Sequence, residues 1–517
     1  MKIDNFSLTL GKDRRIGTLK AARSAGYRMK NSLLLMSTAM LAACATSPHG
    51  VERLTTDRDA LFATAPDAPA EWAARGVEGV AAPGNWLDQF NDPVMNDLVA
   101  EALRANPTLE SRAASLRASA ALSRSARGQR WPSLSAAATF GGTSTGVSLP
   151  GGGDDRINGE VYGLGLDTSW EFDLWGRISN GIAQADADYA ATAADLAASE
   201  LSIAAQTASA WISLNEALAQ ERIAVLTFEA RQRVVDLTEP RVRAGIYGPL
   251  ELRTARSVLA QAEASIAARR QFSTEAARRL EVLLGRYPSA EVAAPALIPE
   301  MPPMEVVGNP ALLLSRRPDI AALEARVVGA GLRAEEARLA LLPSLSLTGS
   351  VGTNETDISD ALDPSLIAAR LIGNLVQPIF TGGRLDAQRL AAIAQAEAAV
   401  ANYASAALDA WREVENALTA DILIAQQEEA QGRAFEEARF AEEIAERYYS
   451  EGTVNVFNLI DAQTRRLTAE SQLVTARADR ARNRINYHLA LGGGVPVMEP
   501  AAEEDLFDTD AAESGRR

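Results

Sequence analysis

Residues that could do chemistry are few in this chain and lie far apart. The 517 residues include one cysteine, Cys44, and two histidines, His49 and His488. Catalysis or metal binding needs a nucleophile beside a base, or several ligands at a fixed spacing, and no Walker loop, His-Glu-x-x-His or Cys-x-x-Cys motif occurs. Three pairs of adjacent glutamates (428–429, 436–437 and 442–443) are more typical of a solvated helix face than of a site. We therefore expect no enzyme, no metal site and no cofactor.

The composition is acidic and rich in small apolar residues. Lys and Arg number 51 against 67 Asp and Glu, which gives a net charge of -16. A nucleic-acid partner needs clustered positive charge, so none is expected. Hydrophobic residues make up 47% of the chain, which is ample for a folded core. The mature chain has no run of about 18 uncharged apolar residues, so no membrane-spanning helix is expected.

The single cysteine lies at the end of a candidate export signal. Arg28 and Lys30 form a positively charged region, an apolar stretch follows at 33–40, and small residues at 41–43 precede Cys44. This order of charge, apolar stretch and small residues is that of a cleavable signal peptide.

The segment resembles a bacterial lipoprotein signal with its lipobox. The resemblance implies a signal peptide at 1–43, with Met29 as an alternative start, and a lipidated Cys44 that begins an anchored segment at 44–84. Ala45, in place of an aspartate, favours the outer membrane for such an anchor. The alternative is an ordinary secretory signal in which Cys44 is incidental.

The chain contains a tandem duplication. Matching residues recur at a spacing of 211 in the early part of each copy and of 207 further on. The pairs are Pro107 with Pro318, Pro132 with Pro343, Gly176 with Gly383, Gly245 with Gly452 and Gly285 with Gly492. Several pairs in one order indicate two copies of a unit of roughly 190 residues.

Each copy predicts the same succession of elements. A helical stretch of about 30 residues (98–130; 312–341) is followed by two alternating segments that predict strands, at about 133–141 and 161–173 and at about 344–353 and 366–380. A polar tract at 141–160 predicts a long hairpin loop, and helices at 176–240 and 383–452 would each reach about 100 Å. The domains expected are repeat 1 at 85–286, a Pro-rich connector at 287–311, repeat 2 at 312–493 and an acidic disordered tail at 494–517.

These strands predict an assembly of several chains. A β-structure in a membrane must be closed so that no backbone edge meets lipid, and a single-chain barrel needs about eight strands. Four strands from each of three chains would close a 12-stranded outer-membrane barrel, with the long helices forming a periplasmic α-helical barrel below it. The fold class is therefore mostly helical α+β in a homotrimer. The alternative is a soluble periplasmic coiled-coil lipoprotein with two incidental hairpins.

Four motifs stand out along the two repeats: Trp-Leu-Asp-Gln-Phe-Asn-Asp-Pro at 86–93, Asp-Leu-Trp-Gly-Arg at 173–177, Leu-Ser-Arg-Arg-Pro-Asp-Ile at 314–320 and Gln-Pro-Ile-Phe-Thr-Gly-Gly-Arg-Leu at 377–385. They resemble those of outer-membrane efflux proteins, in the lipoprotein branch that serves resistance-nodulation-division pumps. The resemblance implies a passive exit duct for drugs and other small toxic compounds. It would be anchored in the outer membrane of a Gram-negative bacterium and docked to a periplasmic adaptor and an inner-membrane pump. The alternative within this class is the outer-membrane channel of a type I protein secretion system.

The resemblance also implies a gate at the periplasmic helix-turn-helix tips. Gly452 and Thr453 resemble the start of the tip motif, and Asp461 matches its second acid, whereas Asn458 stands where the first acid is usual. Asp461 alone is equally well explained as a surface acid near a helix N-terminus.

Two further positions match the family's gate. Tyr449 matches the gate tyrosine, and Glu251 stands at the acidic position that bonds it in the family. Val454 replaces an arginine seen in some members. The tips that would dock the adaptor are marked by Gly245 and Gly248 in repeat 1 and by Gly452 and Thr453 in repeat 2.

Overall fold

The computed structural model describes residues 68–69, 71–74, 77–78, 86–148, 154–301, 305–306 and 310–493. The predicted signal peptide, Cys44, His49 and the predicted tail lie outside the described residues. Within them, the helices are η1 (Trp86–Phe90), α3 (Pro93–Ala105), α4 (Pro107–Gly128), α5 (Arg177–Arg243), α6 (Pro249–Leu283), α7 (Pro310–Arg316), α8 (Pro318–Leu339), α9 (Ile358–Ala361), η2 (Pro364–Leu366), α10 (Arg384–Ser450) and α11 (Val456–Ala490). The strands are β1 (Val77–Glu78), β2 (Ser133–Ser148), β3 (Asp154–Phe172), β4 (Glu305–Val306), β5 (Ser344–Gly352) and β6 (Ala368–Val376). The chain is thus α+β and mostly helical.

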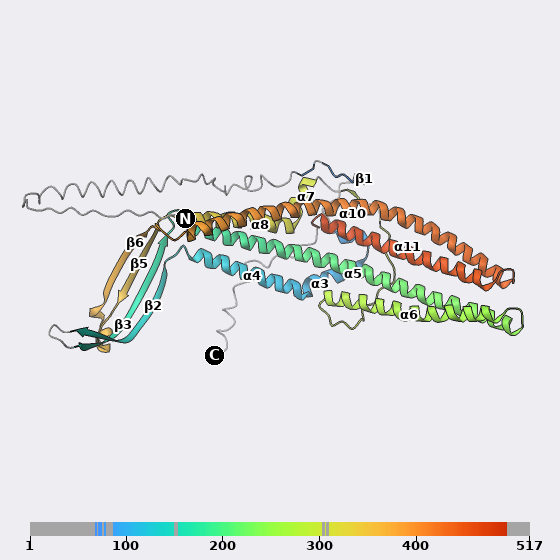
Figure 1. The fold of residues 1–517 in the computed structure, drawn as a ribbon, viewed down its shortest axis with the longest axis horizontal. Helices are drawn as coiled ribbons and strands as arrows, with labels where there is room; N and C mark the ends of the chain where they lie inside the picture. Colours follow the sequence, from blue (N-terminus) through green and yellow to red (C-terminus); the bar gives the residue numbers. More distant parts are fainter. Residues whose placement is uncertain are drawn as a thin grey trace, which may run out of the picture. The chain divides into compact units, whose positions relative to one another are not determined.

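The duplication is visible in the helices (Figure 1). Helices α5 and α10 have 67 residues each, α6 and α11 have 35 each, and α4 and α8 have 22 each. At 1.5 Å per residue, α5 and α10 each extend about 100 Å. In the described part of the chain, none of the helices is both long enough and apolar enough to span a bilayer.

The predicted 30-residue helices are wrong in one respect, because each is divided in two. Helix α3 ends at Ala105 before α4 begins at Pro107, and α7 ends at Arg316 before α8 begins at Pro318. Proline has no N–H to continue the hydrogen-bond ladder and pushes the preceding residue toward an extended conformation. Asn106 and Arg317, which precede the prolines, have ψ of 121° and 119°.

These two residues make equivalent contacts in the two repeats. The Asn106 side chain donates to the carbonyl oxygen of Leu283 at 2.8 Å, at the end of α6. Arg317 donates to the carbonyl oxygen of Ala490 at 3.2 Å, at the end of α11. Leu283 and Ala490 are themselves 207 positions apart, so the duplication extends to individual hydrogen bonds. We call this pair of contacts the repeat clasp.

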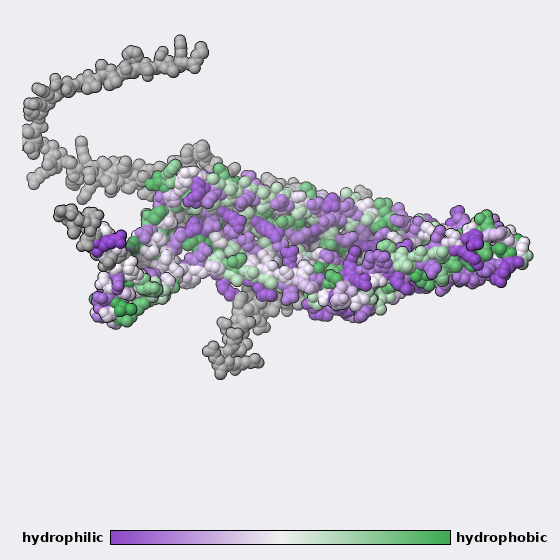
Figure 2. Space-filling view, turned by 60° about the horizontal axis from the view of Figure 1, so that its bottom comes forward, coloured by the Kyte–Doolittle hydropathy of each residue, from purple (hydrophilic) through white to green (hydrophobic). Residues whose placement is uncertain are grey.

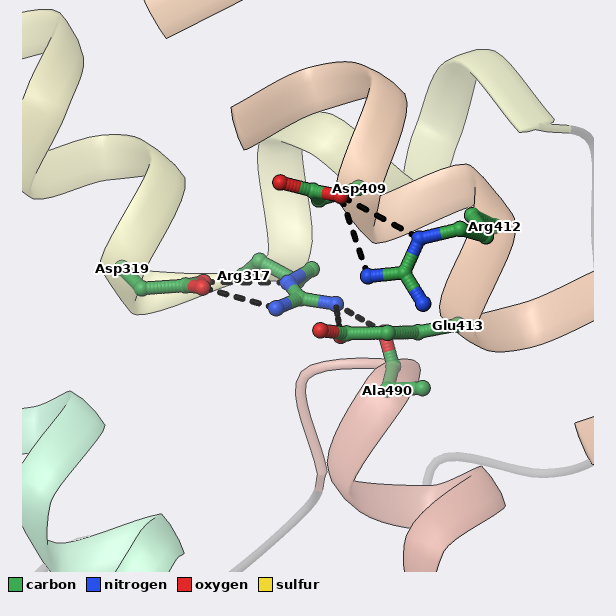
Figure 3. Close-up of polar contacts among 6 residues, drawn as sticks. All are labelled: Arg317, Asp319, Asp409, Arg412, Glu413 and Ala490. Atoms are coloured by element: carbon green, nitrogen blue, oxygen red, sulfur yellow. Dashed lines mark hydrogen bonds and ion pairs between the residues drawn. The ribbon is translucent and has the colours of Figure 1, made fainter. Parts of the chain in front are cut away.

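In repeat 2 the clasp is charged (Figure 3). Arg317 binds both carboxylate oxygens of Asp319, at 3.0 and 2.7 Å, and one oxygen of Glu413 on α10 at 2.7 Å. Burial alone would raise the pKa of Asp319, but the hydrogen bonds and charge of Arg317 lower it below its usual value. Helices α8, α10 and α11 therefore meet at one guanidinium group.

The four-stranded sheet is antiparallel in the order β2-β3-β5-β6. Directly opposed residues share a face, and the register places Ala136 opposite Leu166, Trp170 opposite Leu347, and Leu345 opposite Leu375. The other face carries Ser135 opposite Asp167 and Ser346 opposite Asn374. The sheet thus has one largely apolar face and one more polar face, and Figure 2 shows hydrophobic and hydrophilic residues side by side at this end of the molecule.

The strand boundaries correct the prediction. The tract at 141–160 is not a long loop, because β2 continues to Ser148 and β3 begins at Asp154, with pairing from Gly141–Val161 to Ser148–Asp154. Ladder hydrogen bonds use backbone groups, so polar and glycine-rich residues can extend a hairpin that has already formed. In repeat 2 the second strand is shorter than 366–380, since β6 spans Ala368–Val376.

Helix α5 also exceeds its predicted end. Pro240 was expected to stop it, but the helix continues to Arg243 with Pro240 inside it. A proline costs one hydrogen bond and introduces a clash with the preceding turn. Here it lies in the last turn, so only three helical residues follow the distortion.

The connector between the repeats is fastened to helix α6. The buried carboxylate of Glu281 accepts N–H groups of Ala290, Glu291 and Val292, at 2.7, 2.7 and 3.3 Å. Burial would raise the pKa of Glu281, and these three donors lower it instead. Strand β4 in the connector pairs in parallel with β1, and α7 begins at Pro310, two residues before the predicted start of repeat 2.

Candidate functional site

The candidate site is formed by two helical turns, one in each repeat, at the same end of the long helices (Figure 1). One turn follows α5 and the other follows α10, and both are closed by the same pair of backbone hydrogen bonds. Gly245 and Ile246 donate to the carbonyls of Val242 and Arg241, and Gly452 and Thr453 donate to those of Tyr449 and Tyr448. This is the Schellman motif, which requires a left-handed residue after the helix, and Gly245 and Gly452 have φ of +72° and +77°.

An apolar cluster holds the two turns together. Its buried members come from all four helices that enter or leave the turns: Val234, Val235, Ala255, Tyr449, Val456 and Leu459. Tyr449 and Val456 are completely buried. We call the two turns and this cluster the tip.

The family resemblance implied a bond between Tyr449 and Glu251. Tyr449 lies at the centre of the tip, but it does not bond Glu251. Its hydroxyl lies 2.7 Å from the hydroxyl of Thr238 on α5. Thr238 uses its own hydrogen to donate to the carbonyl of Val234 at 2.6 Å, so Tyr449 is the donor in this pair. Thr238 on α5 thus contacts α10 through Tyr449, whereas Glu251 belongs to the first turn of α6.

Glu251 instead folds back toward the start of its own helix. A Cβ atom at Gly248, the N-cap of α6, would lie 3.1 Å from the Glu251 carboxylate oxygen Oε2. That oxygen is buried and accepts no hydrogen bond from the described residues. Gly248 thus leaves the space that the carboxylate occupies, which is a structural reason for this glycine.

Arg241 joins the two turns. Its guanidinium donates to the carbonyl oxygens of Tyr449 and Ser450, both at 2.9 Å, in the last turn of α10. It also lies over the Tyr449 ring at 4.8 Å and the Tyr247 ring at 5.7 Å, and these two rings are stacked at 6.2 Å. The two hydrogen bonds and the contact with the Tyr449 ring connect repeat 1 with repeat 2. The contact with Tyr247 lies within repeat 1, in the turn after α5.

A second polar contact lies further up the helices. Arg231 on α5 is buried and donates to the carbonyl of Ile460 at 3.2 Å, to Gln463 Oε1 at 2.8 Å and to Thr464 Oγ1 at 2.7 Å, all on α11. Burial lowers the pKa of Arg231, while the nearby charge of Glu442 acts to raise it. This contact holds α5 on α11 independently of the tip.

Asn458 and Asp461 are exposed on the first turns of α11. The Asp461 side chain is 62% exposed and pairs with Arg465 one turn later at 2.8 Å. Such a pair contributes little to stability and partly neutralises the acid within one chain. Thr453 uses its hydroxyl in the turn itself, donating to the carbonyl of Tyr448 at 2.9 Å.

Sequence reasoning missed three residues of this region: Thr238, Arg241 and Arg231. Arg241 carried a usable signal, because a basic residue in the last turn of a helix can bond helix-end carbonyls. Its acceptors, however, belong to the other repeat, and Thr238 has no motif of its own. Such partners depend on which helices lie side by side, which local patterns do not specify.

Among the described residues, no group of three His, Cys, Asp or Glu that could hold a metal occurs. The sequence does contain one Gly-x-Ser-x-Gly string, at 142–146, which is the spacing of a hydrolase nucleophile turn. It lies within β2, with Gly142 paired to Glu160 and Gly146 to Arg156, and not at a strand-to-helix turn.

Comparison with known proteins defines the class. The family model described as outer membrane efflux protein matches residues 98–286 and 309–493. The solvent efflux pump outer membrane protein SrpC of Pseudomonas putida is 28% identical over 79% of this chain and 87% of its own length. The probable outer membrane lipoprotein SilC of Salmonella typhimurium is 26% identical over 79% and 88%. Among solved structures, the outer-membrane channel OprN superposes with a TM-score of 0.74 at 30% identity, covering 83% of this chain and 97% of its own.

A duplicated helical hairpin unit joined to a small two-faced sheet is thus the protomer of an outer-membrane channel. The chain belongs to the outer membrane efflux protein family. Its expected place in the outer membrane and its expected role as an exit duct in efflux are confirmed.

Proposed function

We propose that three copies of this chain form the exit duct of a tripartite efflux system. The observation that carries the proposal is the sheet. Strands β2 and β6 lie at its two edges, each with one neighbouring strand, and one sheet face is largely apolar. An open edge cannot lie in lipid, so the edges must pair with further strands, and three copies supply twelve.

The duct is passive, with no bond made or broken, and its energy comes from the partners. We propose a periplasmic adaptor and an inner-membrane pump of the resistance-nodulation-division type as those partners. The tip lies at the end of α5 and α10 that is furthest from the sheet. Its turns at Gly245–Gly248 and Gly452–Thr453 are the proposed docking points. The relative SrpC is named for solvent efflux, which favours small apolar toxic compounds as cargo.

Deletion of the gene in its native host tests the role. We expect sensitivity to solvents and small apolar drugs to rise, and the intact gene to restore resistance. Unchanged susceptibility together with loss of a secreted protein from the medium would favour a type I secretion channel instead.

Cys44 is the proposed lipid attachment site. Replacing it by Ser should abolish labelling by radioactive palmitate, because the thiol that accepts the lipid is lost. Labelling that persists in the Cys44→Ser protein would contradict the assignment. Ser37→Ala, a substitution within the apolar stretch of the signal, is the control and should leave labelling unchanged.

We further propose that the tip is the gate, with Tyr449 at its centre and with Glu251, Asn458 and Asp461 around it. Tyr449 supports this role by its complete burial and its bond to Thr238 across the two repeats. Tyr449→Phe should raise conductance in planar bilayers, and an unchanged conductance would remove Tyr449 from the gate. Asp461→Asn should weaken cation preference if three copies bring this exposed acid to the pore.

A further inference from the structure

We propose that Arg241 is the latch of the gate: it holds the repeat-2 turn against the repeat-1 turn within one protomer and so sets how rarely the duct opens at rest. This inference rests on the proposed gate and names the residue that controls it. Arg241 is a positioning residue, since it acts through the end of α10 and need not touch the cargo.

The acceptors of Arg241 explain why it can hold a helix end. The carbonyl groups in the last turn of a helix lack intrahelical partners and carry the negative end of the helix dipole. Arg241 places two nitrogens at 2.9 Å from the carbonyl oxygens of Tyr449 and Ser450 in this turn. The Tyr449 oxygen also accepts the N–H of Gly452, so Arg241 uses its second lone pair. A guanidinium can make both bonds at once because its donors form a rigid planar fork.

Aromatic rings complete the contact. The guanidinium carbon lies 4.8 Å from the centre of the Tyr449 ring, within the range of a favourable cation–π contact. No carboxylate in the described ranges forms an ion pair with Arg241. Its charge is therefore balanced by two α10 carbonyls, by the Tyr449 ring and, within its own turn, by Tyr247, whose hydroxyl oxygen lies 3.4 Å from the guanidinium. Separation of the turns would leave the cation without its partners on α10.

The position of Arg241 makes the contact releasable. Each turn is closed by its own backbone Schellman bonds, so neither hairpin needs the Arg241 side chain for these bonds. Further from the turn, Arg231 keeps α5 bound to α11. Loss of the Arg241 contact leaves the end of α10 held only by the apolar cluster and the Tyr449–Thr238 bond, while the helices above stay packed.

The neighbouring Arg243 provides a matched control. It lies on the same last turn of α5, its side chain is 75% exposed, and it pairs with Glu239 at 3.7 Å on its own helix. Arg243→Gln removes one positive charge from the tip without removing a contact to repeat 2. Arg241→Gln removes the same charge together with the latch.

The experiment is single-channel recording of the purified full-length protein in planar lipid bilayers, with the trimer first verified by gel filtration. Arg241→Gln should raise the open fraction at least about tenfold, which corresponds to about 1.4 kcal/mol. Arg243→Gln should leave it at the wild-type value. Arg241→Lys keeps the charge but can satisfy fewer acceptors in a fixed geometry, and should give an intermediate open fraction.

Three results would overturn the latch. They are an open fraction in Arg241→Gln equal to the wild type, an equal rise in Arg243→Gln, or loss of the trimer in Arg241→Gln while Arg241→Lys is indistinguishable from wild type. The last result would show a structural residue only. A failure of the proposed function can be told apart from a failure of the latch. If the chain were not an exit duct, deletion of the gene would leave susceptibility unchanged, whatever the effect of the Arg241 variants.

Discussion

At the scale of the residue, the hydroxyl pair of Tyr449 and Thr238 predicts an asymmetry between two substitutions. Tyr449→Phe removes a donor, but Thr238 keeps its bond to Val234. Thr238→Val removes the acceptor and leaves a buried tyrosine hydroxyl without a partner, which costs about 1–3 kcal/mol. We expect Thr238→Val to lower the melting temperature in detergent more than Tyr449→Phe does. The reverse order would show that the hydroxyl of Tyr449 finds another acceptor.

His488 predicts a dependence of stability on pH. Its ring stacks on Trp86 at 5.7 Å, and Nε2 lies 3.1 Å from the Gln89 side-chain oxygen. Burial, with the nearby charge of Arg484, lowers the pKa of His488 to about 4. The folded protein therefore resists a proton that the unfolded chain accepts at its ordinary pKa near 6.5.

The contribution of His488 to folded stability is therefore fully present above pH 6.5 and is lost as the pH falls toward 4. The full loss from this one group is on the order of 3 kcal/mol. His488→Gln should flatten the decline of melting temperature between pH 6.5 and 4.5 relative to the wild type. Parallel curves for the two proteins would show that His488 is protonated as readily in the folded state as in the unfolded state.

At the scale of the element, the repeat clasp predicts which of two neighbouring arginines contributes more to the stability of the helix packing (Figure 3). Arg317 is 11% exposed and binds α8, α10 and α11, whereas Arg412 is 58% exposed and pairs with Asp409 on its own helix at 3.0 Å. Arg317→Ala should cost about 1.5–3 kcal/mol, since it removes hydrogen bonds to charged partners. Arg412→Ala should cost at most about 0.5 kcal/mol. Thermal unfolding of both variants, in the same detergent, decides whether the clasp stabilises the packing of these helices.

The elements also show how much of the fold the sequence could predict. The spacing of 207 between Gly245 and Gly452 predicted two equal hairpins, because a glycine after each long helix is needed for the same left-handed turn. The breaks at Asn106 and Arg317 could also have been predicted from the prolines that follow them. The extension of β2 to Ser148 could not, since its serines, threonines and glycines are equally typical of loops and only pairing with β3 fixes them.

The candidate site was predictable to a smaller extent. Tyr449 was identified through its motif, but its partner was assigned to Glu251 by resemblance and the structure places Thr238 there. Arg241 reaches Tyr449 from a position 208 residues earlier. Contacts of this kind depend on the packing of two repeats against each other, and a local pattern contains no information on which side chains will meet.

At the scale of the whole molecule, the sheet requires an environment that one chain does not supply. Leu134, Phe140, Leu371 and Leu375 lie on the apolar face and are each 68–82% exposed. Exposure of so many large apolar side chains on one face marks a surface that contacts lipid or another protein. Together with the two sheet edges, this favours assembly in a membrane over the soluble coiled-coil alternative.

The two faces of β6 make this testable with a pair of nearby substitutions. Leu371 is on the apolar face, opposite Gly349, and Asn374 is on the other face, opposite Ser346. If the apolar face meets lipid, Leu371→Arg should destabilise the inserted protein by about 2–4 kcal/mol when the side chain lies near the bilayer midplane, whereas Asn374→Arg should be tolerated. The measurement is the amount of heat-stable trimer recovered from outer membranes. Equal recovery of the two variants, or greater loss for Asn374→Arg, would contradict the assignment of the Leu371 face to lipid. The barrel would then have to close in a different way.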